Sequence, residues 1–135
     1  MRVIKCRSIS NGIGRGEAII LNDSFGFYGN IDMKTGIIIE KGNPLEGMSI
    51  KDKVFIFPNG KGSTVGSYII YGLKKNKVAP SAIINLETET IVATGVILAN
   101  IPCVDKPEEN ILNIIKNKDF VEVDADKGEI RILDK

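Results

Sequence analysis

The sequence predicts one mixed, β-rich α/β domain that spans residues 1–135. Short apolar runs rich in β-branched residues indicate strands, and apolar residues at helical spacing indicate helices between them. Glycine, asparagine and proline clusters punctuate these segments, as turns do. With 135 residues and 43% hydrophobic content, the chain is long enough to bury one core and too short for two comfortable domains.

The first half of the chain is expected to be mainly strand. Strands are predicted over residues 1–9 and 17–21, on either side of a glycine-rich turn over 11–16 whose glycines can take positive φ. Residues 54–57 form a continuous apolar run that stops at Pro58, which is typical of a strand buried on both faces.

The second half is expected to alternate helices and strands. Ser63 is predicted to be the N-cap of a helix over about 64–75. The apolar stripe of this helix is predicted as Val65, Tyr68, Ile69 and Leu73. The other expected elements are strands over 82–86 and 101–104, helices over 89–99 and 108–116, and a hairpin of 120–123 with 129–133.

The charge and hydropathy pattern excludes several classes of partner. The 18 basic and 17 acidic residues are spread along the chain, so neither nucleic acid nor an anionic membrane is an expected partner. No apolar run approaches the roughly 20 residues of a membrane helix. The N-terminus alternates apolar and polar residues and resembles no secretory signal, so the protein is expected to be cytoplasmic.

Histidine and cysteine usage narrows the chemistry. The chain has no histidine, which removes the commonest general base and the Ser-His and Cys-His nucleophile pairs. Cys6 and Cys103 match no zinc or iron-sulfur spacing and are expected to be buried, reduced thiols, so no metal ligands are predicted in this chain. Proton chemistry must therefore fall on serine, lysine, a carboxylate or a partner's group.

The most unusual segment is the glycine-rich loop over residues 58–67. It places glycines, Lys61 and hydroxyl groups where a strand feeds a helix, so free backbone N–H groups and the positive helix end should favour an anion. Ser63 would then be a base that removes a proton beside a carboxylate or carbonyl, provided that its alkoxide is stabilised. A tight turn in which Ser63 only caps a helix is the alternative. The spacing of Gly60 and Gly62 does not fit a nucleotide-binding P-loop.

A second glycine cluster, over residues 12–16, contains a single cation, Arg15. On this pattern a structural turn and an anion contact both remain open.

Several further fragments carry a resemblance to a known family. They are Gly16-Glu17-Ala18, Asp32 with Thr35-Gly36, and residues 42–47, 54–58, 60–68, 79–84 and 101–102. Together they span nearly the whole chain, and the loop Gly-Lys-Gly-Ser-Thr-x-Gly-Ser is the most specific part. In these features the chain resembles the aconitase X swivel family.

The resemblance implies a swivelling β/β/α domain with a barrel-like sheet and flanking helices. It implies the small subunit of a two-chain hydro-lyase, whose large subunit carries an iron-sulfur cluster (4Fe-4S) that this chain does not bind alone. The implied reaction removes water from (R)-5-phosphomevalonate to give trans-anhydromevalonate 5-phosphate in isoprenoid biosynthesis. Ser63 matches the family's base, while the open cluster iron would act as Lewis acid on the leaving hydroxyl.

The chain departs from related patterns at two positions. Asn43 stands where related swivel chains often have histidine, and Val65 stands where classical aconitases have a substrate-gripping arginine. Binding of the phosphorylated hydroxy acid is therefore assigned to Lys61, Gly62, Thr64 and Arg15, together with the large subunit. The alternatives are dehydration of another hydroxy acid, such as a hydroxyproline, and a non-catalytic anion-binding scaffold domain.

Overall fold

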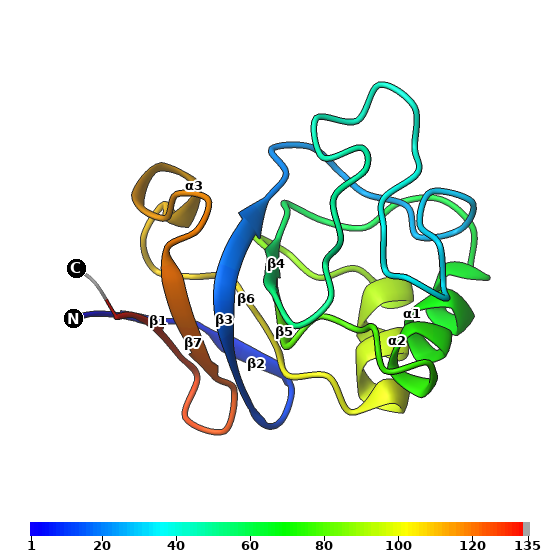
Figure 1. Ribbon diagram of the computed structural model, residues 1–135. Helices are drawn as coiled ribbons and strands as arrows, with labels where there is room; N and C mark the ends of the chain where they lie inside the picture. Colours follow the sequence, from blue (N-terminus) through cyan, green and yellow to red (C-terminus); the bar gives the residue numbers. More distant parts are fainter. Residues whose placement is uncertain (134–135) are drawn as a thin grey trace.

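The computed structural model describes residues 1–133 and contains an eight-stranded sheet, in the order β1-β8-β7-β3-β4-β5-β6-β2 (Figure 1). The strands are β1 (Arg2–Lys5), β2 (Arg7–Ser10), β3 (Ile13–Ile20), β4 (Val54–Ile56), β5 (Ala82–Ile84), β6 (Cys103–Asp105), β7 (Phe120–Asp124) and β8 (Glu129–Ile132). Only Cys6 separates β1 from β2, yet β1 pairs with β8 and β2 pairs with β6, at opposite edges of the sheet. The sheet is therefore a nearly closed barrel, which confirms the expected fold class.

The barrel has a parallel and an antiparallel part. β3, β4, β5 and β6 run parallel to one another. β7, β8 and β1 extend the sheet beyond β3, and β2 extends it beyond β6, all in antiparallel pairs. All residues of β4, β5 and β6 are buried, which confirms the prediction of a buried strand over 54–57. Because neighbouring strands from β3 to β6 share one direction, the segments that follow them leave the barrel at the same edge.

Side chains alternate between two cores across β4. Val54 and Ile56 belong to a core built from strands all around the barrel, whereas Phe55 and Phe57 belong to a second core under the helices and the long loop after β3. In the second core the ring centroids of Phe25 and Phe27 are 4.9 Å apart, in an edge-to-face contact. This aromatic cluster fixes the long loop against β4, next to the glycine-rich segment.

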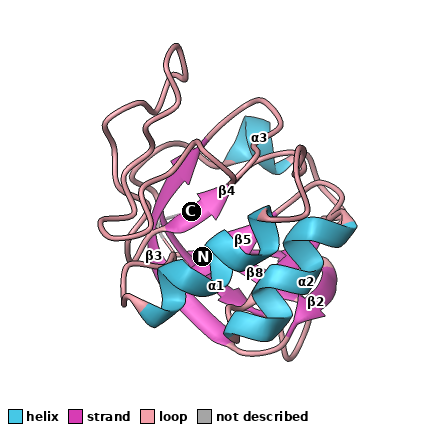
Figure 2. Cartoon of the chain, turned by 90° about the vertical axis from the view of Figure 1, so that its right-hand side faces the viewer, coloured by secondary structure: helices cyan, strands magenta, loops and turns pink. Residues whose placement is uncertain are grey.

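Two helices, α1 (Gly66–Lys75) and α2 (Thr90–Ala99), lie side by side outside the barrel (Figure 2). α2 confirms the prediction of a helix over 89–99. α3 (Ile111–Ile114) is a single turn that buries Ile111 in the barrel core. Across residues 1–133, none of the helices has the length and apolar character needed to span a bilayer.

The prediction of a glycine-rich turn over 11–16 is wrong. β3 begins at Ile13 and runs through Gly14, Arg15 and Gly16. A Cβ atom on Gly14 would lie 2.0 Å from the carbonyl oxygen of Ser81, so the missing side chain allows two backbones to approach closely. These glycines therefore serve packing and not a turn.

The predicted start of α1 is wrong, and its predicted apolar stripe is right only in part, since Leu73 is buried and Ile69 packs against the core. The N-cap is Val65 and not Ser63, and Val65 and Tyr68 are 40% and 71% exposed. The buried face includes Ser67, whose hydroxyl donates to the carbonyl of Ile91 over 2.7 Å. Small residues face α2 because they let the two helices approach, and hydrophobicity alone does not reveal this.

The helix predicted over 108–116 is reduced to α3. The backbone N–H of Glu108 donates to the carbonyl of Lys5 over 2.9 Å, so this segment is tied to β1 where a helix would otherwise begin. The predicted C-terminal hairpin is confirmed by β7 and β8, with Val121 opposite Ile132.

Candidate active site

The candidate site lies where the parallel strands end. After β3 the backbone N–H of Leu21 donates to Ile56, and after β4 the N–H of Phe57 donates to Ile84. The backbone N–H of Leu86 in turn donates to Pro58. The segments after β3, β4 and β5 are thus joined at one edge, at the carboxyl ends of the parallel strands.

A short bridge holds the start of the glycine-rich loop. The N–H of Phe25 donates to the carbonyl of Asn59 over 3.1 Å, and the N–H of Lys61 donates to the carbonyl of Phe25 over 3.2 Å. Ser24 adds a hydrogen bond from its hydroxyl to the side chain of Asn59. Because Phe25 is anchored in the aromatic cluster, the buried core positions the loop up to Lys61.

Beyond Lys61 the loop presents free backbone donors. Within the described part of the chain, the N–H groups of Gly62, Ser63 and Thr64 have no hydrogen-bond partner, and all three residues are exposed. Gly62 has φ +91°, a conformation that L side chains rarely adopt. Three successive donors of this kind form a backbone nest that suits an anion.

The nest stands at the positive end of α1. That helix has no side-chain cap and no acidic residue in its first turn, so no internal charge offsets its dipole. Its first N–H groups are satisfied by the loop itself, since Gly66 donates to the carbonyl of Ser63 and Ser67 to that of Thr64. The N–H groups without a partner are therefore those of Gly62, Ser63 and Thr64, and not those of the first helical residues. We call these three N–H groups the amide nest.

The Ser63 hydroxyl takes part in a local turn. Its Oγ accepts a hydrogen bond from the backbone N–H of Val65 over 3.1 Å. Such a bond is stronger to an alkoxide than to a hydroxyl, because charge on the acceptor shortens and strengthens it. The Ser63 oxygen is thereby held at the positive end of α1, where a negative charge on it would be stabilised.

A cleft of about 140 Å³ adjoins Lys61 and brings a distant turn to the site. Its walls include Ser24, Lys41 and Asn43, so residues 40–44 lie next to the glycine-rich loop. The side chain of Asn43 donates to Glu40 over 2.9 Å and accepts from the N–H of Leu45 over 2.8 Å. Asn43 thus stabilises its own turn, and no ionisable role is needed there.

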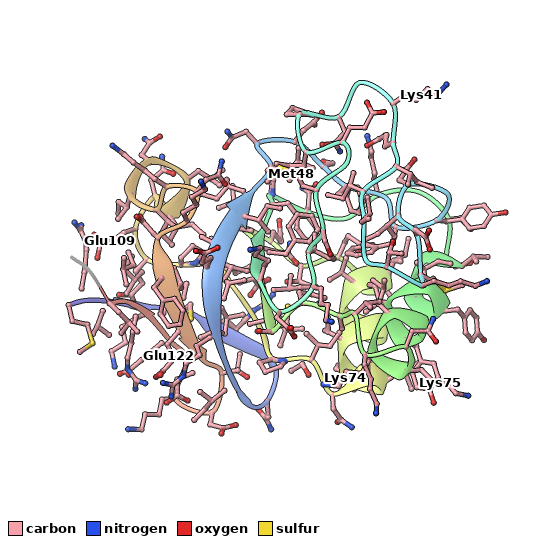
Figure 3. The ribbon with its side chains drawn as sticks, viewed as in Figure 1. Lys41, Met48, Lys74, Lys75, Glu109 and Glu122 are labelled. Atoms are coloured by element: carbon pink, nitrogen blue, oxygen red, sulfur yellow. The ribbon has the colours of Figure 1, made fainter. Side chains whose placement is uncertain are left out.

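Arg15 is not brought to the loop. It lies on β3 opposite Glu122 of β7, with its guanidinium 3.3 Å from that carboxylate and 64% of its side chain exposed. At about 3.3 Å per residue, it lies roughly 17 Å before the end of β3 at Ile20. In Figure 3, Glu122 and Lys41 appear at opposite ends of the molecule.

Buried polar groups fix the segment that precedes α2. The amide of Asn85 donates to the carbonyl of Phe57 over 3.0 Å and accepts from the Thr88 hydroxyl. The N–H of Thr88 donates to buried Asp105, whose carboxylate also accepts two hydrogen bonds from Arg7. This network ties the ends of β4, β5 and β6 together beneath the site.

Glu89 is a site residue that the sequence analysis does not single out. Its carboxylate caps α2 and lies against Gly60 at the start of the loop. A signal for it exists, because Glu89 is the sole charged residue in the otherwise uncharged run 89–99. Glutamate is not among the preferred N-cap residues, so capping rules do not identify it.

The two cysteines do not form a cluster site. Across the described residues, no group of three or more cysteine, aspartate and glutamate side chains could hold a metal. Burial raises the pKa of Cys103 to about 12, and burial with the nearby carboxylate of Asp105 does the same for Cys6. Both thiols are therefore protonated near neutral pH.

Comparisons with known proteins agree with this architecture. The family model described as "Aconitase X swivel domain" matches residues 3–132. The "Phosphomevalonate dehydratase small subunit" of Methanococcoides burtonii is 46% identical, with 98% of this chain and 96% of that protein covered. The Methanosarcina mazei protein of the same name is 51% identical, with 96% and 90% covered.

A solved structure supports the same assignment. A chain in the crystal structure of Thermococcus kodakaraensis aconitase X (holo-form) has a TM-score of 0.94 and 46% identity, with 99% of this chain and 100% of that chain covered. Sequence and fold thus agree along almost the entire chain. The chain therefore belongs to the aconitase X swivel domain family.

Proposed function

We propose that this chain is the small subunit of a two-chain phosphomevalonate dehydratase, and that Ser63 is its proton-abstracting base. The observation that carries the proposal is the Ser63 hydroxyl, which accepts the Val65 N–H beside the amide nest at the positive end of α1. The printed names of the relatives support the substrate, and the chemistry of the loop suits it, since a phosphorylated hydroxy acid carries two anionic groups.

In the proposed reaction, the Ser63 alkoxide removes a proton from the carbon beside the substrate carboxylate. The electrons of that C–H bond form the carbon–carbon double bond, and the hydroxyl on the neighbouring carbon leaves as hydroxide with its own bonding pair. Transfer of the abstracted proton from Ser63 to this hydroxide would release water and return the alkoxide. The amide nest and Lys61 hold the carboxylate or the phosphate, which fixes the reacting carbon near Oγ. Since the described residues offer no ligand set for an iron-sulfur cluster, we assign that group to the large subunit.

Exposed apolar side chains beside Ser63 support a partner subunit. A groove between α1 and α2 is lined by Thr64, Tyr68, Ile91 and Leu98, and Tyr68 and Leu98 are 71% and 55% exposed. Exposed apolar patches of this kind mark interfaces in soluble proteins. The groove adjoins the loop that must face the reacting centre, so we infer that the large subunit covers it.

Replacing Ser63 tests the catalytic role. In the complex with the large subunit, Ser63→Ala should lower the rate of 5-phosphomevalonate dehydration by on the order of 10²–10⁴-fold, because a positioned base contributes about that much. The measurement is an anaerobic dehydration assay. Ser8→Ala, an exposed serine on β2, is the matched control and should keep the wild-type rate. Undiminished turnover by Ser63→Ala would remove Ser63 from the mechanism.

A charge introduced into the groove tests the interface. Leu98→Asp should weaken association with the large subunit by at least tenfold, since it places a charge in an apolar contact, and gel filtration or calorimetry would measure this. Ile13→Asp changes a similarly exposed residue on β3, away from the groove, and should bind as wild type. If the wild type, Leu98→Asp and Ile13→Asp all bind the large subunit equally well, the interface lies elsewhere.

A further inference from the structure

Helix α2 begins with an uncommon cap. Glu89 has an extended backbone, and its carboxylate accepts from the N–H of Ile91 over 2.9 Å and from the N–H of Val92 over 2.7 Å. Serine, threonine, aspartate and asparagine usually occupy this position, and their shorter side chains make the same bonds. The longer side chain at Glu89 therefore has a reason beyond capping.

The same carboxylate packs against the glycine-rich loop. A Cβ atom on Gly60 would lie 2.3 Å from Oε1 of Glu89 and 2.6 Å from Cγ2 of Val92, so the lack of a side chain there makes room for the glutamate. Gly60 also forms the bridge with Phe25 and precedes Ser63 by three residues. Glu89 thus contacts both the start of α2 and the segment that leads to Ser63.

The two helix starts lie close together but differ in charge. The Ser67 hydroxyl reaches the carbonyl of Ile91 over 2.7 Å, so the first turns of α1 and α2 touch. Each N-terminus carries roughly half a positive charge. At α2 this charge is met by Glu89, whereas α1 has neither an acidic residue nor a side-chain cap in its first turn.

We propose that Glu89 is a positioning residue that directs the anionic group of the substrate to the amide nest. Its carboxylate fills the start of α2, where a phosphate or carboxylate would otherwise compete, and its contact with Gly60 holds the loop in place. This inference rests on the proposed function, because it assumes that an anionic substrate binds beside Ser63.

A titration of the full-length chain with inorganic phosphate, followed by amide NMR shifts, tests the charge effect without catalysis. In the wild type, phosphate should shift the amides of Gly62, Ser63 and Thr64 and leave those of Ile91 and Val92 unchanged. In Glu89→Ala, phosphate should also shift Ile91 and Val92. Glu87→Ala removes an exposed carboxylate two residues away and should behave as wild type.

Unchanged Ile91 and Val92 amides in Glu89→Ala would overturn the proposal, as would a wild-type amide nest that does not respond to phosphate. If Glu89→Ala fails to fold, Glu89→Gln takes its place, because it keeps the volume and removes the charge. The same shifts are expected for that variant, and their absence counts equally against the proposal.

Kinetics of the complex with the large subunit separate positioning from simple capping. Glu89→Gln should raise KM for 5-phosphomevalonate by roughly tenfold relative to Glu87→Gln. Glu89→Asp retains charge and cap but is too short to reach Gly60, so it should keep KM and lower kcat several-fold. Wild-type kinetics for both Glu89 variants would overturn the inference. Activity in Ser63→Ala, by contrast, would overturn the proposed function and leave the phosphate titration interpretable.

Discussion

Two segments of this chain place one cation between two glycines, Gly14-Arg15-Gly16 and Gly60-Lys61-Gly62. The first lies inside β3, where Arg15 is aligned with Glu122 in the sheet and its side chain pairs with that carboxylate. The second leaves the sheet and leads into the amide nest at the start of α1. Similar residues therefore produce a strand in one place and an exposed loop with unpaired backbone donors in the other.

The difference lies in what the glycines make possible. Gly14 and Gly16 allow close approach to the carbonyls of Ser81 and Asp52, whereas Gly62 has open space around it and takes φ +91°. At Gly14 and Gly16 close packing keeps the backbone N–H groups within the sheet. At Gly62 the positive φ turns the neighbouring N–H groups toward solvent. Glycine content alone does not distinguish these uses.

Substitution of Gly14 should have the largest effect on stability. Gly14→Ala places Cβ 2.0 Å from the Ser81 carbonyl oxygen, and backbone atoms cannot move aside cheaply. The free energy of unfolding should fall by about 3 kcal/mol, as in severe overpacking. Urea unfolding monitored by circular dichroism measures it. A variant as stable as the wild type would contradict the packing role of this glycine.

Gly62→Ala should cost little stability but much activity. The nearest atom to the added Cβ is Cα of Gly26, at 3.9 Å, which is an ordinary contact, so the cost of about 1 kcal/mol in stability comes from the positive φ. Relief of that strain reorients the amide nest, and kcat/KM of the complex should fall at least tenfold. Gly47→Ala has a similar φ of +85° and open space, and serves as control. Equal activity of the two variants would refute the proposed use of Gly62.

Substitutions of the two cations, Lys61 and Arg15, should have the smallest effects, and their effects on KM should differ. Lys61→Met should raise KM roughly tenfold, equivalent to about 1.4 kcal/mol, and the effect should shrink at high salt. Arg15→Met removes an exposed ion pair worth less than about 1 kcal/mol and should leave KM unchanged. Steady-state kinetics at two ionic strengths decide the matter. A higher KM in Arg15→Met would restore Arg15 as a substrate ligand.

The elements with a clear local signal are predictable from the sequence. The buried strand β4, the helix α2 and the hairpin of β7 and β8 are confirmed because their apolar patterns are continuous or bounded by strong turn residues. The nearly closed barrel confirms the fold class that the family resemblance implies. The role of Ser63 stays a prediction, although its hydroxyl lies at the positive end of α1 as the loop pattern suggests.

The remaining features depend on contacts between distant residues. The course of β3 depends on the approach of Ser81, the buried face of α1 depends on Ile91, and the short α3 depends on Lys5. Glu89 gains its second contact from Gly60, which is 29 positions away in the chain. No local pattern contains these relations, because tertiary packing overrides propensity.

The pairing of Arg2 with Ile132 has a consequence for biosynthesis. Residues 2–5 leave the ribosome before their partner strand, which is made more than a hundred residues later. At about 5–20 residues per second, the nascent chain waits roughly 6–25 s before β1 can pair with β8. Such high contact order slows folding, and bare edges invite strand exchange between neighbouring copies on a polysome.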